Sequence, residues 1–156
     1  MGALGLEPTG ASRLASGWEI TRVDLPYISQ AWPYVEGYVE KGLEHTMREF
    51  DPWDVYQELR RGAAQLWLIV DEEKNLHGCV ITEILQYPRR TSCRIWITAG
   101  EHLVKWNDAI EVIEAWARYR GCDLLCAVAR QEWTHQAKKH GYTTVHHAYY
   151  KTLVNN

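Results

Sequence analysis

An amphipathic segment between two apolar runs is the feature that most constrains the fold of this chain. Residues 103–120 repeat large apolar side chains at the spacing of one helix face, and Gly121 follows where such a helix would stop. The stripe consists of Leu103, Trp106, Ile110, Ile113 and Ala117. The apolar runs 94–98 and 124–128 on either side predict strands, the second of them buried. A strand, a crossover helix and a second strand predict a parallel pair.

The segments before this unit predict the rest of a sheet. The patterns give, in order, a strand at 18–23, helical segments at 24–42 and 51–62, and strands at 65–70, 77–84 and 94–98. Short polar turns join the last three strands, which indicates an antiparallel meander. After 124–128 we expect a short helix that ends near His140 and a last strand at 145–154. The predicted fold class is α/β (α+β), with a mixed, mostly antiparallel sheet of six to seven strands and helices on both faces.

The first 17 residues differ in composition from the rest of the chain. Residues 1–17 are rich in Gly, Ala, Ser and Thr, which predicts a flexible N-terminal arm before a domain at 18–156. This segment has neither the basic region nor the apolar region of a signal peptide, so we expect the protein in the cytoplasm or in an assembly made there. The arm is a candidate for holding a neighbouring subunit in an oligomer.

Charge and cysteine usage argue against several classes of partner. The net charge of −3 gives no electrostatic reason to expect nucleic acid. No apolar run approaches the roughly 20 residues that span a bilayer. The four thiols lie within or beside apolar segments and are expected to be small core residues, at Cys79, Cys93, Cys122 and Cys126. Their spacing does not form a metal site, so we expect no metal.

Four pieces of the chain, taken in order, resemble one known family. They are the hairpin at 67–81 with Gly78 after its turn, the strand 95–98 that leads into the long helix, the apolar strand 124–128, and residues 136–142 that end in the pair Gly141-Tyr142. This order is similar to that of the GCN5-related N-acetyltransferase (GNAT) superfamily, over about residues 18 to 153. The many Trp residues and few motifs are similar to GNAT-like proteins encoded by bacteriophages, some of which are associated with the virion.

The resemblance implies a place for acetyl-CoA. In that family the cofactor lies in a gap between the two strands that correspond here to 94–98 and 124–128. Its pantetheine arm pairs with the first of these strands, which implies Trp96 and Thr98 as cofactor-binding residues.

The turn before the long helix is implied to hold the pyrophosphate. Unsatisfied backbone N–H groups and the helix dipole favour an anion there, which adds Gly100, His102 and Lys105 to the cofactor-binding residues. The family normally carries two glycines at this turn, whereas this chain has one. Glu101 also departs from the pattern, because its charge would repel a pyrophosphate.

The groups that would move protons depart from the family as well. Active members often carry a Tyr four residues before the Gly of the Gly-aromatic pair, and here that position is Ala137. His135 is the nearby candidate for a general acid. Glu83 on the third strand is the candidate for a general base that deprotonates an amine, ahead of Glu101 and Glu132.

Aromatic side chains cluster in the two helical segments that precede the meander. They are Trp32, Tyr34, Tyr38, Trp53 and Tyr56. In the family these helices wall the acceptor site, which implies an aromatic acceptor pocket. The alternative interpretation is core packing together with a protein interface, where Trp and Tyr are enriched, and we favour it.

Two functions fit these observations. The first is a divergent N-acetyltransferase that uses acetyl-CoA and acts on an unknown amine. The alternative is a catalytically inactive protein of the same fold with a structural or assembly role, for example a bacteriophage virion or accessory protein. The departures at the turn and at Ala137 favour the second function, and the order of the elements favours the first.

Overall fold

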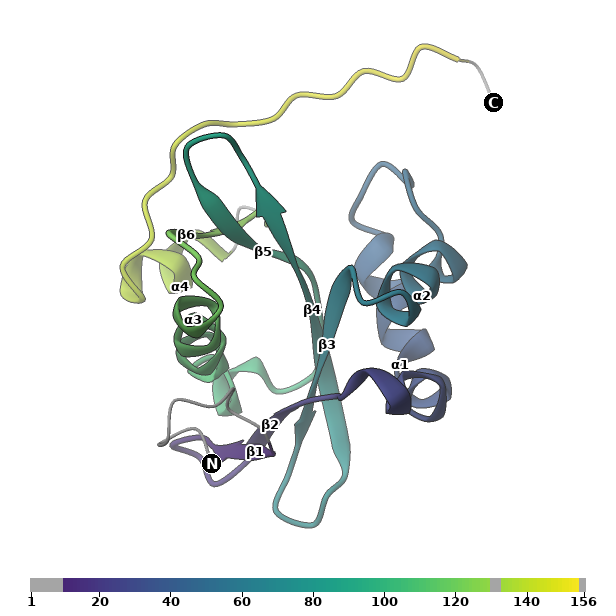
Figure 1. Ribbon diagram of the computed structural model, residues 1–156, viewed down its shortest axis with the longest axis vertical. Helices are drawn as coiled ribbons and strands as arrows, with labels where there is room; N and C mark the ends of the chain where they lie inside the picture. Colours follow the sequence, from purple (N-terminus) through teal and green to yellow (C-terminus); the bar gives the residue numbers. More distant parts are fainter. Residues whose placement is uncertain (1–9, 130–132, 155–156) are drawn as a thin grey trace.

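The computed structural model describes residues 10–129 and 133–154, and its centre is a six-stranded sheet (Figure 1). The strands lie side by side in chain order: β1 (Ala11–Arg13), β2 (Glu19–Arg22), β3 (Ala64–Val70), β4 (Leu76–Gln86), β5 (Thr91–Gly100) and β6 (Leu124–Ala127). Neighbours from β1 to β5 are antiparallel, and β5 and β6 are parallel. The predicted fold class and the parallel pair around the long helix are therefore confirmed.

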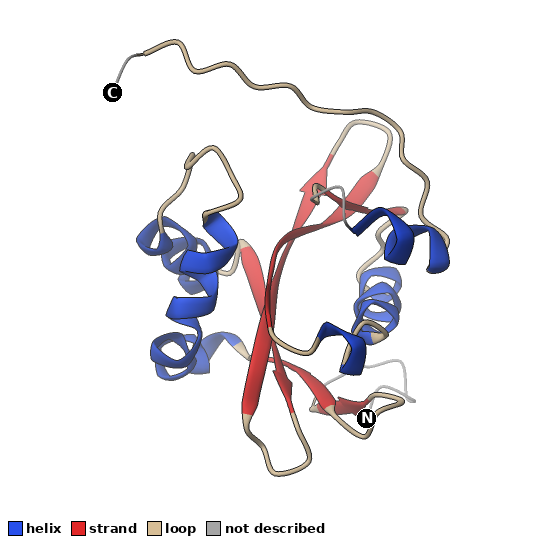
Figure 2. Ribbon diagram, turned by 180° about the vertical axis from the view of Figure 1, so that it is seen from behind, coloured by secondary structure: helices blue, strands red, loops and turns tan. Residues whose placement is uncertain are grey.

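Helices cover both faces of the sheet. The two on one face are α1 (Ile28–Leu43) and α2 (Pro52–Arg60), and the two on the other are α3 (Ala109–Tyr119) and α4 (Thr134–Lys139) (Figures 1 and 2). Each face has its own cluster of buried side chains, one under α1 and α2 and one under α3. The sheet therefore separates two hydrophobic cores. A gap between β5 and β6 connects its two faces.

The first core follows from the helical spacing of α1 and α2. α1 buries Ile28, Trp32, Val35, Val39 and Leu43 along one stripe. It begins at Ile28, so Pro33 lies inside the helix. α2 begins at a capping box in which the Asp51 side chain accepts from the Asp54 backbone N–H, and the Asp54 side chain accepts from the Asp51 backbone N–H.

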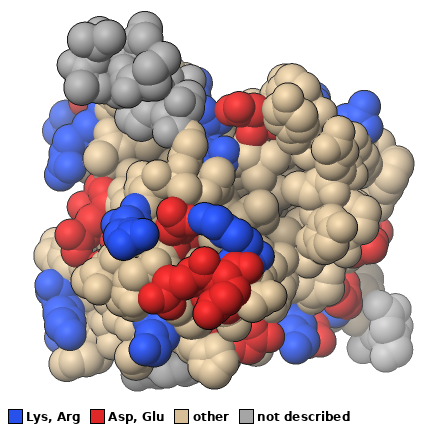
Figure 3. Space-filling view, turned by 90° about the horizontal axis from the view of Figure 1, so that it is seen from below, with Lys and Arg blue, Asp and Glu red and all other residues tan. Residues whose placement is uncertain are grey.

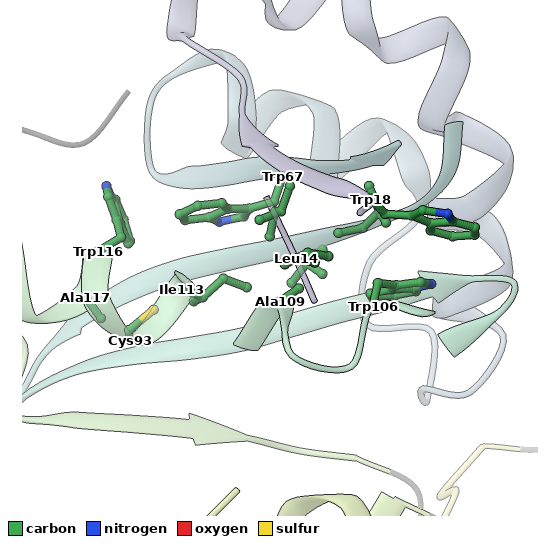
Figure 4. Packing of buried hydrophobic residues seen from close by; sticks show 12 residues of the cluster. Leu14, Trp18, Trp67, Cys93, Trp106, Ala109, Ile113, Trp116 and Ala117 are labelled. Carbon is green, nitrogen blue, oxygen red and sulfur yellow. The ribbon is translucent and has the colours of Figure 1, made fainter. Parts of the chain in front are cut away.

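The second core is built around indole rings (Figure 4). Trp67 of β3 and Trp116 of α3 meet edge to face, with ring centroids 5.3 Å apart. The Trp67 Nε1–H donates to Thr82 Oγ1 at 3.0 Å, which satisfies a buried polar group. These contacts hold α3 against β3 in the middle of the sheet. The connection from β5 to α3, residues 101–108, must therefore reach this position.

The long helix is shorter than predicted. Residues 103–120 form a single 3₁₀ turn at Leu103–Lys105, a further turn, and then α3 from Ala109. The Trp106 Nε1–H donates to the Glu101 carbonyl oxygen at 2.8 Å, and the Ser16 hydroxyl donates to the Lys105 carbonyl oxygen at 2.6 Å. These bonds use groups of the turn in tertiary contacts and keep residues 101–108 out of a regular helix.

The end of the chain also differs from prediction. The last strand predicted at 145–154 is absent from the described structure, where residues 143–154 form an extended segment outside the sheet. β6 was predicted to be buried, and this is wrong, since Leu124 is 49% exposed and Cys126 is exposed. The second difference follows from the first, because without a seventh strand β6 lies at the edge of the sheet.

The other cysteines lie deeper than Cys126. Cys79 and Cys93 are buried as predicted, and burial raises the pKa of each thiol to about 12. Cys122 is half-buried. All four are free thiols, and the prediction of a core position is wrong for Cys126 alone.

Part of the segment predicted as a flexible arm lies in the sheet. Of residues 1–17 the structure describes 10–17, and Ala11–Arg13 is the edge strand β1, paired with β2. Leu14 is 5% exposed and belongs to the second core. Residues 1–9 lie outside the described residues, so the interpretation of an arm that holds a neighbouring subunit stays a prediction.

From the turn between β3 and β4 we predict that the free energy of unfolding falls in acid. The turn lies on a face where Asp and Glu side chains gather beside Lys and Arg side chains (Figure 3). The Asp71 carboxylate accepts from the backbone N–H groups of Glu73 and Asn75 and contacts His77 Nε2 at 2.8 Å. The hydrogen bond with His77 is the main cause that lowers the pKa of Asp71 to about 2.

The sign of the effect follows from the lowered pKa. Ionised Asp71 stabilises the fold above the unfolded pKa of about 4, and this contribution is lost as the pH falls through about 2. We expect Asp71→Asn to be less stable than the native protein at neutral pH, with the difference shrinking between about pH 4 and pH 2. Urea unfolding at several pH values measures this, and a difference that stays constant over that range would contradict it.

Candidate functional site

β5 and β6 separate at one end and leave the sheet open there. Their pairing runs from Ser92 opposite Leu124 to Ile95 opposite Ala127, where β6 ends. β5 continues to Gly100, so its edge beyond Ile95 has no neighbouring strand among the described residues. The backbone groups on this edge can pair with an extended ligand in the way that a strand would.

A β-bulge lies where the strands separate. Ile81 of β4 pairs with Ile97 and the next residue, Thr82, pairs with Ile95, so Trp96 is an extra residue in β5. The bulge changes the alternation of side chains, and both Trp96 and Ile97 pack on the side of α1 and α2. The Trp96 ring there meets Phe50 of the α1–α2 loop, with centroids 4.9 Å apart.

A cavity of about 540 Å³ occupies the opening. Its walls on one face of the sheet come from α3 and α4, including Ile110 and Ala137. On the other face the α1–α2 loop lines it, including His45 and Glu49. The cavity therefore joins both sides of the sheet through the gap, and its volume is in the usual range for small-molecule sites.

A smaller cavity of about 190 Å³ lies beside the first and shares His45 and Thr98 with it. Lys41 at the end of α1 lines this smaller cavity, together with Gly100 at the end of β5. It therefore adds a second cationic side chain beside the gap, after Arg94 of the larger cavity.

Three of the five predicted cofactor-binding residues lie at these cavities. Trp96 and Thr98 line the larger one, and Gly100 lines the smaller one. His102 lines neither of the two, and its ring instead packs edge-on against Trp18 and His77. Lys105 also lines neither of the two cavities formed by the described residues, and it is exposed.

The need for glycine at position 100 comes from packing. A Cβ atom on Gly100 would lie 2.4 Å from the His77 carbonyl oxygen and 2.6 Å from the Gly78 Cα. The residue also has φ of +151°, which side chains of L residues rarely adopt. The glycine is thus explained by the close approach of β4 and β5, without any ligand.

Glu101 points away from the cavities into a hydrogen bond. The Tyr38 hydroxyl donates to Glu101 Oε2 at 2.9 Å. Burial raises the pKa of Tyr38 to about 12, and the bond to Glu101 adds to this effect. Tyr38 therefore holds the carboxylate whose charge is unfavourable for a pyrophosphate.

The two predicted catalytic residues are not at the cavity. Glu83 forms an ion pair with Arg94, which lies directly opposite it on β5. Arg94 lines the larger cavity and Glu83 does not. His135 is exposed on α4 and does not line either cavity in the described part of the chain. The third carboxylate candidate, Glu132, lies outside the described residues.

His140 lines the larger cavity and was not among the residues predicted from the sequence. Its Nδ1 lies 3.6 Å from Glu111 Oε2, and its buried Nε2 has no hydrogen-bond partner among the described residues. The buried Gln136 Oε1 also has none. The spacing of Gln136 and His140, four residues apart, was a signal that both face the same side of a helix.

A tyrosine completes this wall of the cavity. The Tyr142 hydroxyl donates to Glu114 Oε2 at 2.6 Å. Burial, followed by this bond, raises the pKa of Tyr142 above its usual range. Because its proton is engaged with Glu114, Tyr142 is a weaker proton donor for a ligand than the unpartnered edge of His140.

The five predicted aromatic residues do not line the two cavities. Trp32 packs against Tyr56 at 5.0 Å and Trp53 packs against Tyr56 at 5.5 Å. Tyr34 is 75% exposed and Trp53 61% exposed, on the outer side of the helices. Trp32 and Tyr56 therefore have the packing role that we favoured, and on this face of the sheet the α1–α2 loop lines the larger cavity.

Two other features, a membrane-spanning helix and a metal-binding group, are absent from the described residues. No helix of the described residues is long and apolar enough to cross a membrane. The same residues contain no group of three or more His, Cys, Asp or Glu that could hold a metal ion. The gap between β5 and β6 is the candidate functional site.

Comparison with known proteins places the fold. No family model matches the sequence, and no curated protein matches it. Solved structures do match. A probable acetyltransferase superposes with a TM-score of 0.65 at 13% identity, over 88% of this chain and 98% of the other. A predicted acetyltransferase with acetyl-CoA from Clostridium acetobutylicum gives 0.62 at 15% identity, over 87% and 96%.

A third structure extends the likeness. Ribosomal-protein-alanine N-acetyltransferase from Brucella melitensis biovar Abortus 2308 gives a TM-score of 0.60 at 18% identity, over 88% of this chain and 99% of the other. The fold of the chain is thus GNAT-like.

Proposed function

We propose that this protein is an N-acetyltransferase that takes an acetyl group from acetyl-CoA and transfers it to an amine. The observation that carries the proposal is the cavity of about 540 Å³ in the gap between β5 and β6. Two substrates must meet for such a transfer, and this cavity opens toward α3 and α4 on one face and toward the α1–α2 loop on the other.

The residues present fit acetyl-CoA. The edge of β5 from Trp96 to Thr98 offers backbone groups to the amides of a pantetheine arm. Lys41 at the smaller cavity offers a positive charge to phosphates. His140 and Gln136 both line the cavity, and each has a buried polar atom without a hydrogen-bond partner among the described residues, which supports a polar ligand beside them.

The transfer requires two proton movements. Acetyl-CoA supplies the thioester; the amine nitrogen forms a bond to the acetyl carbon as the carbon–sulfur bond breaks. The amine must lose a proton, and Glu49 and His45 on the acceptor side are the groups that can accept it. The sulfur takes up a proton, and His140, which lines the cavity, is the proposed donor in place of the tyrosine that is absent at 137.

A binding titration tests the proposal. We expect CoA and acetyl-CoA to bind the full chain in the micromolar range when titrated by calorimetry. Acetylation of a mixture of small amines and peptides by radiolabelled acetyl-CoA would then identify the acceptor class. No binding at millimolar CoA would overturn the proposal and leave the alternative, a protein of this fold with a structural or assembly role.

The variant Lys41→Glu tests whether the phosphates of CoA bind at the smaller cavity. We expect the variant to bind CoA about tenfold more weakly, because one charge-assisted contact is lost and a repulsive charge is added. Lys138→Glu, at an exposed position on α4, is the control with the same change of net charge. Equal weakening in both variants would mean that only long-range charge matters and that Lys41 makes no contact.

A further inference from the structure

The C-terminal segment is extended and exposed. Residues 143–154 follow α4 without helix or strand, and every one of them is exposed. Figures 1 and 2 show the segment running past the β4–β5 turn, outside the sheet. Its backbone makes no hydrogen bond to the other described residues. A chain with twelve exposed, unpaired residues has backbone groups available for a partner.

The segment nevertheless has the pattern of a strand. Val145, Tyr149 and Leu153 are 83%, 90% and 87% exposed. They are separated by even numbers of residues, so an extended chain places all three on one face. Burial of these three apolar side chains against a partner strand would favour the contact and oppose the cost of ordering the chain.

β6 offers the complementary surface. It pairs only with β5 among the described residues, so its outer edge has unpaired N–H and C=O groups. Leu124 at its start is 49% exposed and Val128, just past its end, is 75% exposed. An open, apolar edge strand is a template for a further strand.

We propose that residues 143–154 of one copy pair with the outer edge of β6 of a second copy, which returns the same contact. The partner is a second copy because the donor segment runs past the β4–β5 turn and not along its own β6, whose outer edge has no partner among the described residues. A reciprocal exchange satisfies both and closes as a twofold dimer. The inference does not depend on the proposed activity. Tyr150 of the segment lines the larger cavity, so the exchange would also change that wall.

The mass in solution is the first test. We expect the full chain to sediment as a dimer and a chain lacking residues 143–156 to sediment as a monomer. The buried core residues of the described structure all precede this segment, so circular dichroism should show that the truncated chain folds. A full chain that is monomeric, or a dimer that survives the truncation, would overturn the proposal.

Point variants separate this contact from two others. Tyr149→Asp should dissociate the dimer by at least tenfold in Kd, whereas Tyr34→Asp, at a similarly exposed tyrosine on α1, should not. Removal of residues 1–9 should leave the dimer intact. Dissociation by either control with no effect of Tyr149→Asp would assign the interface to α1 or to the N-terminal segment and contradict the proposal.

A cross-link distinguishes exchange from folding back. Cys126 of β6 is an exposed free thiol. Single substitutions Val145→Cys, His147→Cys and Tyr149→Cys, each oxidised with diamide, should give a disulfide-linked dimer in at least one position. Cys126→Ser in the same background should abolish that dimer. A disulfide formed within one chain would show that the segment pairs with its own β6, which would overturn the exchange.

Discussion

Ala127→Trp is expected to weaken the binding of CoA by about 100-fold, which corresponds to about 2.7 kcal/mol. Ala127 is the last residue of β6, opposite Ile95, where the two strands separate, and it lines the larger cavity. Leu125 of the same strand packs against the core under α3, so Ala127 points to that same face. An indole at this position would fill the closed end of the gap, where the proposed ligand lies.

The matched control is Leu124→Trp. Leu124 belongs to the same strand, is exposed, and does not line the cavity, so the same new side chain should leave CoA binding unchanged. Calorimetric titration of the native protein and both variants measures the effect. If Ala127→Trp binds CoA as tightly as the native chain, the ligand does not occupy this gap.

The sequence predicted the elements whose pattern is local. α1 and α2 follow from apolar spacing and from the Asp51–Pro52 start, and the meander follows from its short polar turns. The start of α3 could not be predicted this way. Leu103 and Trp106 fit the helical stripe, but Trp106 turns its indole N–H to the Glu101 carbonyl, a tertiary contact that no periodicity shows.

Strand status at the sheet edges was similarly hard to predict. Residues 11–13 lack a strand pattern, and pairing with β2 alone makes them β1. Residues 145–154 have a strand pattern but no described partner within the chain. A strand exists only where another strand provides hydrogen bonds, so composition gives the wrong answer at both ends.

The sequence predicted the position of the gap, but not which polar side chains line it. The gap follows from the order of strands 94–98 and 124–128, and Trp96 and Thr98 do line it. His140 lines the cavity and His135 does not, because of how the short helix α4 is oriented, which the sequence alone did not show. Glu83 looked available as a base because its partner Arg94 lies on another strand, eleven residues away.

Gly100→Ala is expected to destabilise the fold by about 4 kcal/mol. A Cβ at this position would overlap the His77 carbonyl and the Gly78 Cα, at 2.4 and 2.6 Å. Overpacking costs about 1–3 kcal/mol, and a strained backbone conformation costs a similar amount. The melting temperature of a domain of this size should fall by roughly 10 °C. A loss of CoA binding in a Gly100 variant would therefore report on folding and not on a phosphate contact.

Gly37→Ala is the control, with the opposite sign. Gly37 lies in α1, is exposed, and has nothing within 4 Å of the position of a Cβ atom. The same substitution there should stabilise the protein by about 0.5–1 kcal/mol, because alanine favours the helix and restricts the unfolded chain. Thermal unfolding of both variants measures the contrast. Equal melting temperatures for Gly100→Ala and the native protein would mean that β4 and β5 do not approach so closely at Gly100.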